Sequence, residues 1–290
     1  MGIFQRLYSQ MIHYKNAEQI ELMRESALLV SSTLAMLAGE IDEGVKTIHL
    51  DTLAEEFIRD NNARPGFKGL YDCPSTVLTS VNDQVVHGVP NEYELREGDI
   101  VSIDIGVVKN NYYGDHAYTF AIGEPSAEDE LLMQSTKECL YLGIAQAYVG
   151  NRIGDISFAI QSHAHKNGLG VVEQLVGHGL GKRLHEEPNV PNFGKPGRGK
   201  VIKNGLVIAI EPMINLGKKH VVTLSDNFTI ATKDGKRSAH YEHDVAVWDG
   251  KPNILSDFTC IEKVLEKRGL FYIKGNSIEE FFDMSVESKL

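Results

Sequence analysis

Two aspartates interrupt an apolar stretch near the middle of the chain, and they limit how that stretch can fold. In "SIDIGVVKNNYYGDHAYTF", residues 102–120, Asp104 stands between Ile103 and Ile105, and Asp115 follows eleven residues later. Apolar runs of this length predict buried strands, and burying an isolated carboxylate costs several kcal/mol unless a partner compensates it. The fold must therefore bring a positive group or a proton to both aspartates.

The residues between the two aspartates predict a β-hairpin. "VKNNYYG" is rich in turn-forming residues, and a turn at Lys109-Asn110 would place Asp104 directly opposite Asp115. Their Cβ atoms would then be roughly 4.5–5.5 Å apart on one face of the sheet. Two like charges this close are unfavourable unless they are protonated or bridged by a cation. We therefore expect a cation between the two strands.

The chain repeats the same order of features in its second half. Each half opens with two helical patterns of apolar residues, at about 17–40, 46–60, 127–149 and 153–167. "VVHGVP" then places His87 before a glycine in the first half, and "VGHGLG" places His178 before one in the second. This shared order favours an internal duplication over a chance similarity between two strand-rich segments.

The acidic residues follow the same duplication. "GDIVSID" carries Asp104 six residues after its glycine, and "GLVIAIE" carries Glu211 six residues after its own. Each half then supplies a second acid, Asp115 in the first and Glu242 of "YEHDVAV" in the second. Four converging carboxylates require several positive charges, which two divalent ions would provide. His178, whose flanking glycines allow close backbone approach, is the imidazole that we expect beside them.

Composition excludes several other classes of protein. The 290 residues carry a formal net charge of −11, whereas a nucleic-acid-binding core needs a basic face. No apolar run reaches the about 18 residues of a membrane span, and "MGIFQRLYSQ" shows no export signal. The cysteines, Cys73, Cys139 and Cys260, are odd in number and lack metal-binding spacing. They indicate reduced thiols and a cytoplasmic location.

Five motifs, taken together and in order, resemble the methionine aminopeptidases of the bacterial type I form. They are "VVHGVP", "SIDIGVVKNNYYGDHA", "VGHGLG…LHEEPNVPNFG", "AIEPMI" and "AHYEHDVAV", and the resemblance extends over about residues 12–255. It implies the pita-bread fold, a single α/β (α+β) domain in which a duplicated, pseudo-twofold antiparallel sheet is covered by helices. It also implies an enzyme that removes the N-terminal methionine of nascent proteins when the second residue is small.

The resemblance further implies a role for each candidate site residue. The implied metal ligands are Asp104, Asp115, His178, Glu211 and Glu242, with Asp115 and Glu242 bridging two divalent ions. Such a ligand set favours Mn, Fe(II), Co or Zn over copper. Glu211 would accept the proton of the attacking water. His87 and His185 would contact the substrate, and His185 would hydrogen-bond the developing oxyanion or the scissile amide. The residues expected around the methionine side chain are Phe67, Cys73, Leu184 and Phe228.

Neighbouring histidines are interpreted by strand alternation. His116 and His243 directly follow the candidate ligands Asp115 and Glu242 in the sequence, so alternation sends both to the opposite face. His240 shares a face with Glu242 and could lie behind the ligands.

The two ends of the chain fall outside the resemblance. Residues 1–11 are interpreted as an N-terminal extension, whose first ten residues could also come from a misassigned start site. Residues 12–255 are the expected metallopeptidase domain, and residues 256–290 are an extension of unknown role. The predicted partners are the N-termini of nascent polypeptides, with a transient ribosome contact, and we expect a monomer.

Two other functions remain open at this point. Prolidases and proline-specific aminopeptidases use the same chemistry on the same fold. They usually carry a large N-terminal domain, for which the few residues before the first helical pattern leave no room. A non-catalytic peptide-binding module with this fold would be expected to have lost metal ligands, whereas all five candidates are present.

Overall fold

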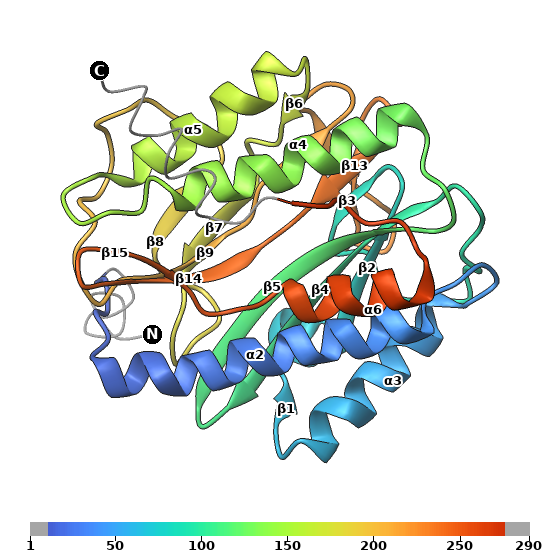
Figure 1. Ribbon diagram of the computed structural model, residues 1–290, viewed down its shortest axis with the longest axis horizontal. Coiled ribbons are helices and arrows are strands. Elements are labelled where there is room, and N and C mark those ends of the chain that lie inside the picture. The colour runs from blue at the N-terminus through green and yellow to red at the C-terminus, as the bar shows by residue number, and fades with distance from the viewer. Residues whose placement is uncertain (1–10, 276–290) are drawn as a thin grey trace.

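The computed structural model describes residues 11–275, in which helices and strands succeed each other in two similar halves (Figure 1). The N-terminal extension predicted at 1–11 therefore lies outside the described residues, except for Met11. The helices are α2 (Ala17–Glu40), α3 (Thr47–Asp60), α4 (Ala127–Ile144), α5 (Ile153–Lys166) and α6 (Thr259–Arg268), with a 3-10 turn at Leu70–Asp72. The predicted helix at 127–149 ends early, because Gln146 N–H bonds to the Gly143 carbonyl (3.0 Å) and tightens the last turn.

The paired strands form antiparallel sheets. The first sheet contains β1 (Arg64–Pro65), β2 (Val77–Val81), β4 (Ile100–Lys109) and β5 (Tyr112–Ala121). The second contains β7 (Val176–Gly179), β8 (Glu186–Pro191), β9 (Val207–Ile210), β14 (His243–Trp248) and β15 (Lys251–Ile254). A third sheet contains β6 (Gly170–Val171), β10 (Met213–Asn215) and β13 (Ser238–His240). A fourth contains β3 (Gln84–Val86), β11 (Val221–Thr223) and β12 (Ile230–Thr232). The backbone N–H of Glu242 donates to the Ala117 carbonyl (3.1 Å) and so links the two halves.

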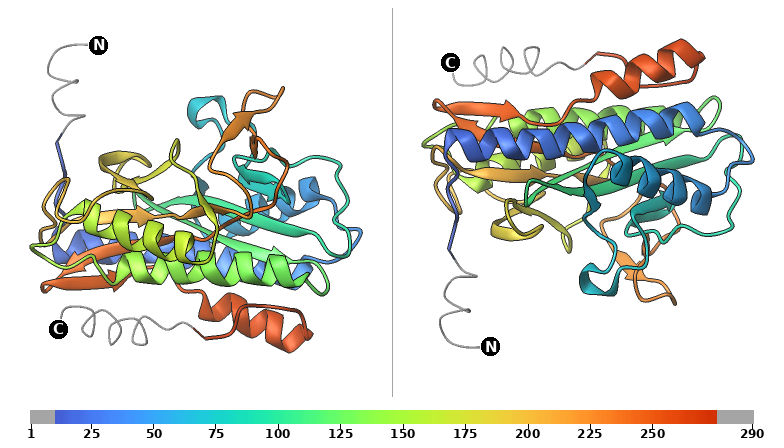
Figure 2. Two further views of the ribbon diagram at one scale, coloured as in Figure 1. Left: turned by 90° about the horizontal axis from the view of Figure 1, so that it is seen from above. Right: turned by 90° about the horizontal axis from the view of Figure 1, so that it is seen from below.

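Helices cover one side of these strands, as Figure 2 shows. α2 and α4 lie against the strands, and α6 lies outside α2, while the loop around 66–73 and the β11–β12 hairpin project from the other side. α2 begins with a capping box, in which Asn16 Oδ1 accepts the N–H of Gln19 (2.9 Å) and Gln19 Oε1 accepts that of Asn16 (3.1 Å). The predicted α/β architecture of antiparallel strands covered by helices is confirmed. Among residues 11–275, no helix has the length and apolarity needed to cross a membrane.

The predicted register of the β4–β5 hairpin is wrong by two residues. Asp104 pairs with Ala117, and Asp115 pairs with Gly106, so the turn residues are Asn110 and Asn111 rather than Lys109 and Asn110. Both asparagines have a left-handed backbone (φ 54° and 63°). A two-residue hairpin of this type needs positive φ at both central positions, which asparagine tolerates far better than lysine does. Because a shift of two residues preserves the face, both aspartates still point to the same side.

Residues 256–275 pack onto the rest of the protein. Ile261 and Leu265 of α6 are buried in the main hydrophobic core together with Phe258 and Ile273. Lys137 of α4 is buried beneath this segment, where its Nζ contacts Glu262 Oε1 (2.6 Å) and the Ile273 carbonyl (2.8 Å). Burial lowers the pKa of Lys137, and the neighbouring Glu262 opposes that effect.

Replacement of Lys137 by methionine should lower the free energy of unfolding by about 3 kcal/mol. The change leaves Glu262 without its ion-pair partner in a largely desolvated position, and breaking a buried pair from one side costs this order of free energy. Urea unfolding measures the loss. The control is Lys219→Met, which removes an exposed ion pair with Glu173 and should leave the unfolding midpoint nearly unchanged. Equal midpoints for the two variants would contradict the anchoring role of Lys137.

Candidate active site

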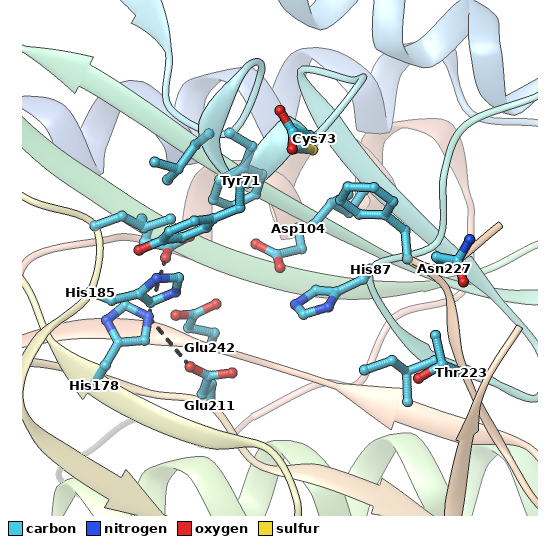
Figure 3. A pocket seen from close by; sticks show the side chains of 18 residues that line it. Tyr71, Cys73, His87, Asp104, His178, His185, Glu211, Thr223, Asn227 and Glu242 are labelled. Carbon is cyan, nitrogen blue, oxygen red and sulfur yellow. Dashed lines mark ion pairs between the residues drawn. The ribbon is translucent and has the colours of Figure 1, made fainter.

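Residues from both halves of the chain line one cavity of about 490 Å³ (Figure 3). All the candidate site residues predicted from the sequence lie in its wall: Phe67, Cys73, His87, Asp104, Asp115, His178, Leu184, His185, Glu211, Phe228 and Glu242. Residues far apart in the sequence therefore meet in one place.

The β4–β5 hairpin supplies the two aspartates, and a glycine between them leaves room for the pocket wall. Gly106 lies opposite Asp115 in the ladder, two residues after Asp104. A Cβ atom at Gly106 would approach the Phe67 ring to 2.4 Å, well inside van der Waals contact. Phe67 can therefore pack directly on the strand that carries Asp104.

The second half places His178, Glu211 and Glu242 around the same space. His178 lies within β7, and Glu211 directly follows β9. A Cβ atom at Gly177 would lie 2.4 Å from the Ala209 carbonyl oxygen, and a Cβ atom at Gly179 would lie 2.2 Å from the Glu187 carbonyl oxygen. The glycines on both sides of His178 thus allow the close strand packing that the sequence suggested.

The protonation of His178 follows from its hydrogen bond. Its Nδ1 lies 3.0 Å from the Gly179 carbonyl, which can only accept, so Nδ1 carries the proton. Burial, with the nearby His185, lowers the pKa of His178 to about 3, and the ring is neutral. Its Nε2 therefore presents a lone pair to Asp115 Oδ2 and Glu211 Oε1, each 3.6 Å away. Because the ring is neutral, these contacts are not ion pairs.

The buried carboxyls resist ionisation in the absence of a cation. Burial raises the pKa of Asp104 to about 7. For Asp115, burial and then the charges of Asp104 and Asp244 raise the pKa well above its ordinary value. Burial also raises the pKa of Glu211 and Glu242 strongly, with neighbouring carboxylates adding to the effect. Each of these shifts would be reversed by a positive charge placed between the carboxylates.

Unsatisfied oxygens show that this group of residues fits a metal ion. Asp104 Oδ1, Asp115 Oδ1 and Glu242 Oε1 are buried and have no hydrogen-bond partner, which is costly for a carboxylate unless a cation binds it. One donor atom each from Asp115, His178 and Glu242 lies within 4.8 Å of the others. Carboxylate oxygens with one neutral imidazole are suitable ligands for a divalent ion.

Two further histidines face the cavity from opposite sides (Figure 3). His87 has a left-handed backbone (φ 60°) directly after β3, and a Cβ at the following Gly88 would meet the Thr79 carbonyl at 2.2 Å. The ring of His185 lies 4.5 Å from that of His178, nearly perpendicular to it. Burial lowers the pKa of both His87 and His185, and the nearby His185 lowers the pKa of His87 further by a smaller amount. Both rings can therefore act as neutral hydrogen-bonding groups.

Part of the remaining wall of the cavity is apolar. Phe67, Cys73 and Leu184 are buried in one hydrophobic cluster, against which the half-buried Phe228 packs. Tyr71 was not among the candidate residues, yet its ring stacks on His185 (5.7 Å, 17°) while 71% of its surface is exposed. The backbone at Tyr71 is left-handed (φ 52°), which sequence patterns did not indicate.

Strand alternation correctly separates the other histidines. His116 and His243 are buried and contact Ser31 and Ser256 rather than lining the cavity. His240 Nε2 lies 3.9 Å from both Glu211 Oε2 and Glu242 Oε2, behind the carboxylates as suggested. Asp244 was missed: its fully buried Oδ2 accepts the backbone N–H of Asp115 (2.9 Å). Its position two residues after Glu242, on the same strand face, was a usable signal.

The fold and this cavity define a class of protein, the metallohydrolases that bind cations between carboxylates. The sequence pattern of metallopeptidase family M24 matches residues 21–249. A methionine aminopeptidase of Clostridium perfringens is 49% identical over 246 residues, which are 85% of this chain and 99% of the relative. The chain therefore belongs to metallopeptidase family M24 and, within it, to the methionine aminopeptidases. It is accordingly a metallo-aminopeptidase, a hydrolase with the pita-bread fold.

Solved structures agree with this assignment. The crystal structure of methionine aminopeptidase from Thermotoga maritima matches with a TM-score of 0.84 at 37% identity, covering 85% of this chain and all of that one. A prolidase from Pyrococcus furiosus has a TM-score of 0.67 at 20% identity and is covered over 67% of its length. The second likeness concerns the fold alone.

Proposed function

We propose that this protein hydrolyses the peptide bond after an N-terminal methionine, when a small residue follows, with divalent metal bound in the described cavity. The ligands would be Asp104, Asp115, His178, Glu211 and Glu242. The observation that carries the proposal is the set of buried carboxyl oxygens without hydrogen-bond partners on Asp104, Asp115 and Glu242, in the same cavity as the lone pair of His178. The relatives named methionine aminopeptidase support the substrate.

The chemistry divides between the bound metal and the residues of the chain. Two divalent ions, when bound, would supply Lewis-acid stabilisation and a lowered pKa for water. Glu211, beside His178 Nε2, would accept the proton of the attacking water and pass it to the leaving amine. His185, as a neutral ring at the cavity wall, would donate a hydrogen bond to the developing oxyanion, and His87 would contact the substrate from the opposite side. Mn, Fe(II), Co and Zn all suit these ligands.

The apolar wall would bind the methionine side chain. Phe67, Cys73, Leu184 and Phe228 offer an aromatic and aliphatic surface, and a thioether makes favourable contacts with such surfaces. The acidic ligands on the opposite wall would receive the free α-amine near the metal, which restricts cleavage to the first peptide bond.

The proposal includes a setting for the reaction. We infer that the enzyme acts in the cytoplasm on the N-termini of nascent polypeptides, with a transient ribosome contact, as a monomer. Residues 12–255 would form the metallopeptidase domain. The cysteines support the cytoplasmic setting, because Cys73, Cys139 and Cys260 are free thiols in the described structure.

Four tripeptides test the substrate assignment. Metal-reconstituted protein should release methionine from Met-Ala-Ser, while Leu-Ala-Ser tests the first pocket, Met-Lys-Ser the second position and Ala-Pro-Ser the prolidase activity. We expect cleavage of Met-Ala-Ser at least about 100-fold faster than that of the others, since a mismatched or uncontacted group in a tight pocket costs this order of rate. Preferential cleavage of Ala-Pro-Ser would overturn the proposal in favour of a prolidase.

A further inference from the structure

Residues 256–258 lie behind β5, which carries Asp115, and β14, which begins directly after Glu242. His116 directly follows Asp115, and His243 directly follows Glu242, so both rings turn away from the cavity. The Phe258 ring stacks on His243 at 3.8 Å between centroids (30° between planes) and lies 5.7 Å from that of His116 (25°). All three rings are buried. One aromatic side chain thus contacts the immediate neighbours of both carboxylates.

Hydrogen bonds from the same segment reach the same two strands. Ser256 Oγ lies 2.7 Å from His243 Nδ1 and accepts the backbone N–H of Asp244 (3.2 Å). The carboxylate of Asp244 in turn accepts the backbone N–H of Asp115 (2.9 Å). Two hydrogen bonds in series, both made by Asp244, therefore connect Ser256 to the backbone of Asp115.

Asp257 makes the corresponding contact on the other side. Its backbone N–H donates to Ser31 Oγ (2.9 Å), and that oxygen lies 3.1 Å from His116 Nε2. Ser256 and Phe258 therefore contact residues of these strands directly, and Asp257 reaches His116 through Ser31 of α2. We name Ser256, Asp257 and Phe258 the back bracket. α6 follows at once and is held in the core by Ile261 and Leu265.

The back bracket lies beyond the part of the chain that the family pattern matches, which ends at residue 249. The contacts described above give the described part of the C-terminal extension a role at the centre of the molecule.

We propose that the back bracket positions Asp115 and Glu242 and thereby sets the metal affinity of the site. This inference rests on the proposed metal centre. Groups behind metal ligands fix the orientation of the ligands, and their loss typically weakens metal binding by about 10–100-fold. Phe258, Ser256 and Asp257 are positioning residues, because they act through His116, His243 and Asp244 and do not line the cavity.

The test compares two truncations of equally buried side chains in full-length protein. Phe258→Ala removes the stacking partner, whereas Leu265→Ala removes a core side chain from the same segment (3% and 2% exposed). Both variants should melt at a lower temperature by circular dichroism. Calorimetric titration of metal-free protein with Co²⁺ should show affinity at least about tenfold weaker for Phe258→Ala and within about twofold of wild type for Leu265→Ala. The absorption spectrum of bound Co²⁺, which reports ligand geometry, should change only in Phe258→Ala.

Ser256→Ala provides a milder variant in case Phe258→Ala does not fold. It should shift Co²⁺ affinity and spectrum in the same direction while leaving the melting temperature close to that of wild type. Equal Co²⁺ affinity in wild type, Phe258→Ala and Ser256→Ala would overturn the proposed role of the back bracket but not the metal centre. A loss of Co²⁺ affinity in Leu265→Ala as large as that in Phe258→Ala would overturn it too. Failure of wild-type protein to bind Co²⁺ would instead overturn the proposed metal centre, and the bracket with it.

Discussion

Replacement of Glu211 by alanine should lower kcat for Met-Ala-Ser by about 10³-fold or more at saturating metal. General acid–base catalysis contributes about 10²–10⁴-fold, and the change also removes a carboxylate that faces His178 Nε2 at 3.6 Å. The fold should survive, because Glu211 follows the end of β9 and its removal relieves a repulsion between buried carboxylates. A discontinuous assay of the methionine released at fixed times measures kcat, and the bound metal is determined on the same sample.

The control for this variant is Glu173→Ala, which removes a surface carboxylate paired with Lys219. It should retain wild-type turnover. Turnover of the Glu211 variant within about tenfold of wild type, with metal bound, would remove Glu211 from the proton-transfer role.

Replacement of His185 by alanine should lower kcat by about 10²–10³-fold and leave metal binding intact. A positioned donor to the oxyanion is worth this much, and the imidazole nitrogen that lies 3.6 Å from Asp115 and Glu211 belongs to His178. His178→Ala is the matched comparison, since the two rings lie only 4.5 Å apart. That variant should lose metal as well as activity, because it deletes the one neutral imidazole of the cluster.

Metal content by mass spectrometry and kcat by methionine release distinguish the two histidines. Loss of metal from His185→Ala comparable to that from His178→Ala would contradict the assignment of His185 to substrate rather than metal. Unchanged turnover of His185→Ala with metal retained would contradict its catalytic role.

The side of the sheet to which each side chain points could be predicted more securely than the residue-by-residue pairing of the strands. Asp104 and Asp115 share a face in the structure although the predicted turn was wrong, because side chains alternate with a period of two and the error was two residues. The error itself came from the backbone conformation of Asn111, whose positive φ of 63° is a property of the turn. An Asn-Asn pair was a signal for that turn.

Contacts between distant segments could not be predicted in the same way. The approach of His185 to His178 depends on the bulged pairing of β7 with β8, and the left-handed Tyr71 depends on a loop without periodicity. In the C-terminal segment the role of residues 256–290 was left open, although Phe258, Ile261 and Leu265 follow a helical spacing that is typical of a packed helix. Nothing in that spacing indicated that Phe258 would pack on His116 and His243.

The most direct test of the central claim is a metal titration of activity. Metal-free protein would receive increasing equivalents of Mn, Fe(II), Co or Zn. At each step the rate of methionine release from Met-Ala-Ser and the number of metal ions bound per chain would be measured. The account predicts no release without metal and a rise that saturates by two bound ions per chain. Full activity in the metal-free protein, or no release with two ions bound, would contradict it.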